Sequence, residues 1–442
     1  MKRILVYLSA LLLLGSVPGQ AQSAWSLKQC IDYGLEHYGT VRLADYQKQT
    51  ADQQARQALG LYLPQVSGTG NFTDNIKLQT SVIPAGIFGP EPTRIAFGQK
   101  YQTNVSASAT QAIYDKSLIL GLKANKPNQQ LADLNSRATR EDIVYNITSN
   151  YYQVFVAQQQ IALLRDNLER TQQVLDILKL QRDNGVIQPV DYTNTEVTYN
   201  NTRSQLSLAE NDLNLALNTL KYQMGLSQDQ PLALPDSLPQ DQVPALGLVQ
   251  FDVNNLAGYQ QGETNLTLQR LQLDRIRAGY QPTLSANASY GTLAFANDFG
   301  GAFRNFNSFG SIGLTLRVPI FDGLQRDAQV KQQKLTVLTQ EEQQKLNASA
   351  YQLQFNNSQS QLQRAQATAQ NDERTVKQAQ EVYNITTLQY KQGVKGLTDL
   401  INADNQYRQA QSNYINSLIN FYRARLDLEQ SQGTLLSFYN QL

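Results

Sequence analysis

Histidine and cysteine, the side chains that most often carry acid–base, metal-binding and nucleophilic chemistry, occur once each in this sequence. His37 lies in a Gln-rich segment expected to be helical, so we expect a hydrogen-bonded or exposed side chain and not a catalytic one. Cys30 lacks a second cysteine, and we expect it to be a small apolar residue of the core. We therefore predict no catalytic residue, no metal site and no cofactor, although an enzyme that uses only Asp, Glu, Ser or Tyr is a disfavoured alternative.

The charges of the chain are nearly balanced, with 37 Lys and Arg residues against 36 Asp and Glu residues and a formal net charge of +1. Such a chain has no long-range field that would attract nucleic acid or an acidic membrane surface. We therefore expect no nucleic acid as a partner. Any function of the charged residues must be local.

Two similar segments hold charged residues beside glycines: "QRDNGVIQPVDYTNTEVTY" at residues 181–199 and "QYKQGVKGLTDLINADNQY" at residues 389–407. The glycines Gly185 and Gly393 are separated by 393 − 185 = 208 residues. Each segment interrupts a long Gln-rich tract that is otherwise expected to be helical. The two segments are therefore expected to be equivalent turns.

The offset of 208 also joins Asp191 to Asp399 and aligns two apolar series that have a seven-residue spacing. These series are Tyr199, Leu206, Leu213 and Leu220, and Tyr407, Tyr414, Phe421 and Leu428. An internal duplication is the simplest account. We predict a first structural repeat at residues 22–226, a Pro-rich linker at 227–250 and a second repeat at 251–442.

Each repeat is expected to contain a helix, two strands, and two long helices joined by a turn. The first helix is predicted at residues 26–60, before Pro64, and its counterpart ends before Pro282. The long helices are predicted from Asp115 to Gly185 and from Asp322 to Gly393. Pro127 predicts a kink or a junction between two helices. Alternation of small or apolar residues with polar ones predicts four strands, at residues 65–73, 101–114, 283–295 and 309–321.

The N-terminus has the features of a cleaved signal peptide, residues 1–21. Basic Lys2 and Arg3 precede the apolar run "ILVYLSALLLLGSV", and "PGQAQ" suggests cleavage after Ala21. A retained anchor is the alternative, but it needs about 20 apolar residues, more than this run supplies. The exported chain could then carry two soluble hairpins, or four strands of an outer-membrane barrel.

Four strands cannot close a membrane barrel, because open sheet edges are not stable in lipid. A dimer would supply eight strands and a trimer twelve, and a conducting pore favours the trimer because side chains fill an eight-stranded barrel. The long helices have a narrow apolar seam and many Gln, Asn, Ser and Thr residues. This pattern suits the staves of a hollow tube better than a solid coiled-coil stalk.

The ordered segments "YLPQVSGTG", "AIYDKS", "NGVIQPVDYTN", "AGYQPTLSANASYG", "VPIFDG" and "QGVKGLTDLINADNQYRQAQSNYINS" resemble the TolC family of outer-membrane efflux proteins. The resemblance covers nearly the whole mature chain. It implies a mixed α and β membrane protein, a homotrimer with a twelve-stranded outer-membrane β-barrel continued by a long α-helical periplasmic tunnel. It also implies an exit duct that works with a periplasmic adaptor protein and an inner-membrane pump of the RND or ABC type.

The resemblance also implies a gate at the periplasmic turns, which contain Gly185, Pro189, Gly393 and Gly396. A latch between the helical hairpins would be made by three residues, Asp191, Tyr390 and Lys395. Lys395 stands where the family more typically has arginine and cannot form the bidentate contact of that residue. Val190 stands where a threonine can occur, which leaves the partner of Tyr390 open.

Asp399 and Asn402 match two positions that line the constriction in the family, and their spacing of three places them on one helix face. Threefold symmetry would give one acidic ring and one neutral polar ring. The alternative for Asp399 is an ordinary acid in the first turn of a helix. For the whole chain, the alternative to a conduit is a structural or adhesive coiled-coil protein of the cell envelope.

Overall fold

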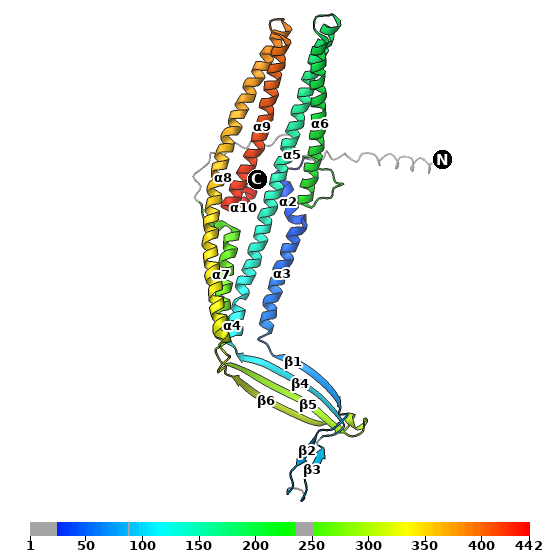
Figure 1. Ribbon diagram of the computed structural model, residues 1–442, viewed down its shortest axis with the longest axis vertical. Helices are drawn as coiled ribbons and strands as arrows, with labels where there is room; N and C mark the ends of the chain where they lie inside the picture. The colour runs from blue at the N-terminus through cyan, green and yellow to red at the C-terminus, as the bar shows by residue number, and fades with distance from the viewer. Residues whose placement is uncertain (1–23, 87–88, 97, 236–250) are drawn as a thin grey trace, which may run out of the picture. The chain divides into compact units, whose positions relative to one another are not determined.

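The computed structural model describes residues 24–86, 89–96, 98–235 and 251–442 (Figure 1). The predicted signal peptide and most of the predicted linker lie outside these residues. The chain divides into two compact units. Unit 1 contains Met1–Asp45, Asn135–Tyr259 and Asn347–Leu442, and unit 2 contains Tyr46–Leu134 and Gln260–Leu346. No helix among the described residues is both long and apolar enough to cross a membrane.

Unit 2 contains a four-stranded antiparallel sheet in the order β1-β4-β5-β6 (Figure 1). The strands are β1 (Gln65–Asp74), β4 (Tyr101–Tyr114), β5 (Thr283–Ala296) and β6 (Asn307–Arg317), which confirms the four predicted strands to within a few residues. Pairing of β4 with β5 joins strands that lie far apart in the sequence.

The segment between β1 and β4 was expected to be a loop, but it contains a second antiparallel pair, β2 (Thr80–Ile83) with β3 (Thr93–Ala96). Isoleucine, valine and threonine in these strands favour extended backbone. The four-residue strands are too short for an alternating pattern to stand out in the sequence.

The register of the four-stranded sheet separates its side chains into two different faces, because residues paired across antiparallel strands lie on the same side. The apolar face includes Val66, Phe72, Val105, Ala109, Tyr290, Ala294, Ile312 and Leu314. The polar face includes Ser67, Thr69, Asn71, Asn104, Ser106, Ser108, Asn287, Ser289, Ser311 and Thr315. Hydroxyl pairs on neighbouring strands bond across the polar face, Ser67 with Ser108 at 3.0 Å and Ser289 with Ser311 at 2.9 Å.

The predicted helix at residues 26–60 is in fact two helices, α2 (Leu27–His37) and α3 (Gly39–Gly60). Tyr38 between them has an extended backbone, and its N–H donates to the carbonyl oxygen of Gly34. The sequence contains no proline there, so the break was not predicted. The side chain of His37 is half exposed and its Nδ1 lies 3.1 Å from the Tyr33 carbonyl oxygen, which confirms the expectation of a hydrogen-bonded or exposed side chain.

The remaining helices include the long ones that were predicted: α5 (Asn125–Asp183), α6 (Pro189–Met224), α8 (Gln325–Lys391) and α9 (Leu397–Gln432). Shorter helices are α4 (Lys116–Lys123), α7 (Ala257–Ala278), α10 (Leu435–Gln441) and the 3-10 turns η1 (Val253–Asn255) and η2 (Gly301–Phe303). Pro127 lies in the first turn of α5, just after the break at Ala124. Such a position tolerates proline because its missing N–H has no helical partner there, so the predicted junction is confirmed.

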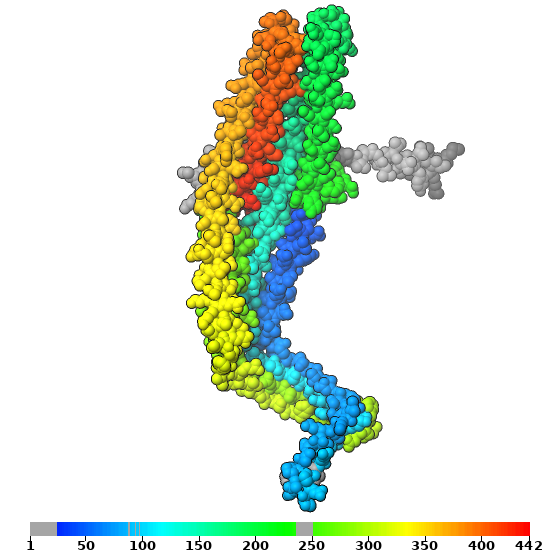
Figure 2. All heavy atoms as spheres, in the orientation of Figure 1, coloured from blue at the N-terminus to red at the C-terminus, as the bar shows by residue number. Residues whose placement is uncertain are grey.

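The core of unit 1 is built from α2, α5 and the end of α6. Ile31, Ile147, Tyr151, Leu220 and Met224 are fully buried there. Cys30 is buried among them, as expected, and burial raises the pKa of its thiol to about 12. In the upper part of unit 1 the side chains of α8 pack against those of α9 (Figure 2).

Candidate functional site

The two hairpin turns of unit 1 have the same backbone. Gly185 ends α5 with φ +71°, and Gly393 ends α8 with φ +73°, a left-handed conformation that glycine adopts without strain. The N–H of Val186 donates to the carbonyl oxygen of Gln181, and that of Val394 donates to the carbonyl oxygen of Gln389. Bonds of this kind satisfy the last carbonyl groups of a helix.

The other two turn residues start the following helices. Pro189 occupies the first turn of α6, and Gly396 precedes α9 with an ordinary extended backbone of φ −81°. Chain reversal at the second turn therefore depends on Gly393. The backbone angles of Gly396 do not require a glycine at that position. Asp399 accepts a hydrogen bond of 3.3 Å from the N–H of Gly396. This contact agrees with the alternative that Asp399 is an ordinary acid in the first turn of a helix.

The residues expected in the latch lie close to the turns. The hydroxyl of Tyr390 on α8 donates to Oε1 of Gln181 on α5, at 2.9 Å, so this glutamine is its partner in place of the missing threonine. Burial raises the pKa of Tyr390, and the nearby Asp191 charge adds to the rise. Asp191 is half-buried in the first turn of α6 and Lys395 is exposed. Among the described residues of this single chain, no ion pair joins these two.

Asp399 and Asn402 are both exposed on α9, whereas Leu400 and Ala403 beside them are buried. Within one chain these two polar side chains thus lie on the face of the hairpin that is directed away from its core. They remain available to a neighbouring copy or to water.

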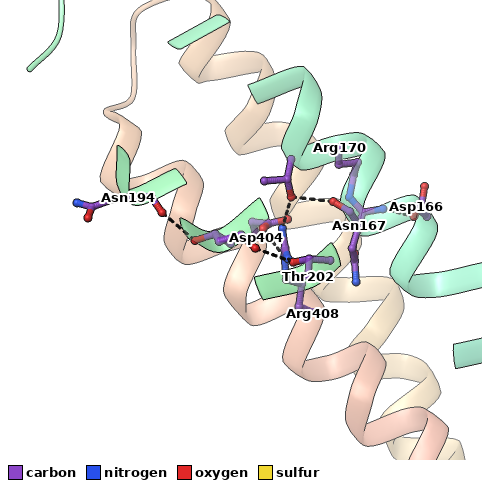
Figure 3. Close-up of polar contacts among 9 residues, drawn as sticks. Asp166, Asn167, Arg170, Asn194, Thr202, Asp404 and Arg408 are labelled. Atoms are coloured by element: carbon purple, nitrogen blue, oxygen red, sulfur yellow. Dashed lines mark hydrogen bonds and ion pairs between the residues drawn. The ribbon is translucent and has the colours of Figure 1, made fainter. Parts of the chain in front are cut away.

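A larger polar network lies further along the same helices and joins three of them (Figure 3). We call it the Arg408 network; its residues are Asn167, Arg170, Thr171, Thr202, Asp404 and Arg408. Arg408 on α9 donates from Nη1 to the hydroxyl of Thr202 on α6, at 2.9 Å, and from Nη2 to that of Thr171 on α5, at 2.5 Å. Its Nε donates to Oδ2 of Asp404 at 2.5 Å. The side chains of Arg408 and Asp404 are each only 17% exposed.

The two threonines of the network are buried and fully bonded. Each donates its hydroxyl hydrogen to the backbone carbonyl four residues earlier, at 2.7 Å for Thr171 and 2.9 Å for Thr202. The lone pairs of the hydroxyls are therefore free to accept from the guanidinium. A buried charge is tolerated only when it is paired and hydrogen-bonded, and Arg408 meets this condition.

Arg170 on α5 makes the reverse connection. Its guanidinium lies 5.5 Å from the ring centre of Tyr383 on α8 and 5.0 Å from that of Tyr407 on α9, within the range of cation–π attraction. It also bonds to Asp166 and Asn167 of its own helix. The two tyrosine rings are stacked with centres 5.9 Å apart. Arg170 therefore reaches from the first hairpin to the second, and Arg408 reaches from the second to the first.

The Arg408 network could not be predicted from the sequence, because the threonines that Arg408 contacts are 206 and 237 residues away in the chain. One signal was present. At the offset of 208, Arg408 corresponds to Asn200 and Asp404 to Glu196, so this charge pair occurs in only one of the two predicted repeats.

Residues 35–226 and 260–434 match the family described as "Outer membrane efflux protein". The match covers most of the chain. The chain belongs to the outer membrane efflux protein family. The resemblance described from the sequence is thereby confirmed, together with the predicted outer-membrane location and conduit function. The alternative of a structural or adhesive coiled-coil protein has no support, and the family is one of channels and not of enzymes.

Individual members of the outer membrane efflux protein family are distant from this chain in sequence but close in fold. "Outer membrane protein TolC" of Escherichia coli (strain K12) is 23% identical over 350 residues, which are 75% of this chain and 70% of that protein. VceC from Vibrio cholerae has a TM-score of 0.75 at 17% identity, over 92% of this chain and 96% of its own. The open state of MtrE from Neisseria gonorrhoeae has a TM-score of 0.74 at 16% identity, over 92% and 89%. This chain thus has the channel fold of the family, which is mostly helical, with its described strands in a four-stranded sheet and a two-stranded pair.

Proposed function

We propose that three copies of this chain form a gated exit duct, with a twelve-stranded barrel in the outer membrane and a helical tunnel in the periplasm. The observation that carries this proposal is the two-faced sheet. A barrel in lipid needs an apolar outer face and, around water, a polar inner face, and the sheet of unit 2 has one of each.

The edges of the sheet support assembly. In one chain, β1 and β6 each have one unpaired edge, and such edges are not viable in lipid. The four strands alternate in direction, so β6 of one copy can pair antiparallel with β1 of the next. Three copies then close a barrel wide enough for a pore.

Exposed apolar residues on the helices of unit 1 support the same assembly. The exposed residues of α6 include Val190 and Val197, and Leu208, Leu215 and Tyr222, in two series with seven-residue steps. The exposed residues of α8 include Leu353, Val382, Ile385 and Leu388. The seven-residue spacing on α6 is that of a seam that packs against another helix, and a neighbouring copy of the chain would supply that helix.

The gate is proposed to lie in the hairpins. The Arg408 network holds α9 against α5 and α6 within one copy, and the bond from Tyr390 to Gln181 holds α8 against α5 near the turns. Asp191 and Lys395 do not pair within one chain, so we propose that they pair between copies. Asp399 and Asn402 would form the acidic and the neutral ring of the constriction.

The predicted repeats, residues 22–226 and 251–442, explain why both hairpins have the same architecture. The ends of α6 and α9 match as well, since Gly225 and Gly433, which are 433 − 225 = 208 residues apart, both have φ +72°. Membership of the family supports a periplasmic adaptor and an inner-membrane pump of the RND or ABC type as partners.

Detergent extraction followed by mass measurement and planar-bilayer recording tests the proposal. We expect a trimer that inserts into bilayers and conducts ions. A monomer that stays in the aqueous phase and gives no conductance would overturn it.

A further inference from the structure

The connection between β5 and β6 folds back onto the apolar face of the sheet. Gly301 of η2 lies against Ala296 so closely that an added Cβ would be 2.8 Å from the Ala296 Cβ. Ala302 next to it is fully buried. The fold-back covers Ala294 and Thr103, which share that face and are buried.

Four aromatic rings hold this connection in place. Phe303 stacks on Phe72 with ring centres 5.5 Å apart, and Phe299 contacts Phe72 and Tyr101 at 5.8 Å and 5.9 Å. Phe299 and Phe303 are themselves 5.5 Å apart. We call these four residues the aromatic foot. Two of them come from strands of the first half of the chain and two from the connection in the second half.

The rings of the aromatic foot are partly exposed. Phe299 is 61% exposed and Phe303 is 49% exposed. Lys100 lies 4.9 Å from the ring centre of Tyr101 and is exposed. Large exposed aromatics beside a lysine are unusual against water but typical of the boundary between lipid chains and headgroups.

We propose that the aromatic foot is a lipid-contacting anchor, seated at the outer boundary of the bilayer and formed partly by a connection outside the strands. The proposal rests on the barrel of the proposed function, because the foot continues the apolar face that the barrel presents to lipid. The occupant is the membrane surface, with acyl chains against the rings and headgroups near Lys100.

The position of the β5–β6 connection also affects the exit of the duct. Since the connection is held on the apolar face, it lies outside the barrel and leaves the polar face uncovered. It does not obstruct the exit of the duct, and the rings stabilise it in that position.

Depth-dependent fluorescence quenching tests the anchor. Trp25 is the single tryptophan, so Trp25→Phe gives a silent background into which one reporter is placed: Phe299→Trp, or Phe303→Trp as a second reporter should the first disturb folding. Tyr290→Trp, in the middle of the apolar face, is the lipid reference, and Val82→Trp in β2 is the water reference. Each protein is reconstituted into vesicles with bromine on the acyl chains and is also titrated with acrylamide.

We expect the Phe299 and Phe303 reporters to lose fluorescence with brominated lipid and to be shielded from acrylamide, with quenching between those of the two references. Reporters in the foot that behave like Val82→Trp, while Tyr290→Trp is quenched by lipid, would overturn the anchor and leave the barrel intact. Absence of lipid quenching at Tyr290→Trp, together with absence of conductance, would overturn both.

Discussion

The guanidinium of Arg408 on α9 reaches the hydroxyl of Thr171 on α5 at a distance of 2.5 Å, while its other terminal nitrogen reaches α6. One side chain thus bonds two helices of the other hairpin. Any movement of α9 away from α5 and α6 must break these bonds. It must also separate the Arg408–Asp404 ion pair from the two threonines. The Arg408 network is therefore the strongest candidate for the element that sets the resting position of α9.

Arg408→Ala should destabilise the hairpin packing strongly. The substitution leaves the Asp404 carboxylate without its partner in a site that is 17% exposed, and breaking a buried pair typically costs about 3 kcal/mol or more. We expect a lower Tm in circular dichroism and more frequent opening in planar bilayers. Arg408→Lys keeps the charge but cannot reach both threonines and Asp404, so its effect should be intermediate.

The matched control for Arg408→Ala is Arg203→Ala, which removes an exposed arginine from α6. Equal Tm and opening frequency in the two variants would contradict the role of the network. Replacing Arg408 and Asp404 together by leucine should restore stability, because both charges are then absent. Opening would still be altered, since the bonds to the threonines are gone.

Tyr390→Phe should remove the bond to Gln181 and cost about 1 kcal/mol, the usual worth of such a hydrogen bond. A double-mutant cycle with Gln181→Ala measures the coupling, and additive effects would show that the two side chains do not interact.

The pH dependence of Tyr390 has a definite sign. Its pKa is raised in the folded state, first by burial, so its stabilising contribution is complete below the unfolded value of about 10 and is lost as the pH rises through the folded value. The difference in unfolding free energy between the wild type and Tyr390→Phe should therefore be constant below about pH 10 and shrink above it.

Gly393→Ala should destabilise the second turn by about 1 kcal/mol, because a side chain is disfavoured at positive φ. Gly396→Ala is the internal control: its φ of −81° suits any residue, and apart from Gly396 and its chain neighbours the nearest atom to the added Cβ is Oδ2 of Asp399, at 3.9 Å. Thermal unfolding of both variants checks the difference. Similar losses of Tm would mean that the turn does not depend on the left-handed backbone.

The strands and long helices could be predicted from the sequence because their periodicity is local. The pattern in β4 alternates over its whole length, and Pro127 marks the α4–α5 junction by its own chemistry. The break at Tyr38 has no such local marker. The Arg408 network and the aromatic foot depend on residues far apart in the chain, and only the register of the folded hairpins and strands brings them together.

The acidic ring can be tested with a pair of substitutions on α9. Asp399→Asn removes the charge and weakens the contact with the Gly396 N–H, so we expect lower cation selectivity and a stability loss of at most about 1 kcal/mol from the helix terminus. Asn402→Asp adds a carboxylate on the same exposed face and should raise cation selectivity, because three copies would place a second acidic ring around the axis. Reversal potentials in a salt gradient measure both effects. If Asp399→Asn lowers the Tm while neither variant changes the reversal potential, Asp399 serves only as a first-turn acid of α9 and the ring assignment is wrong.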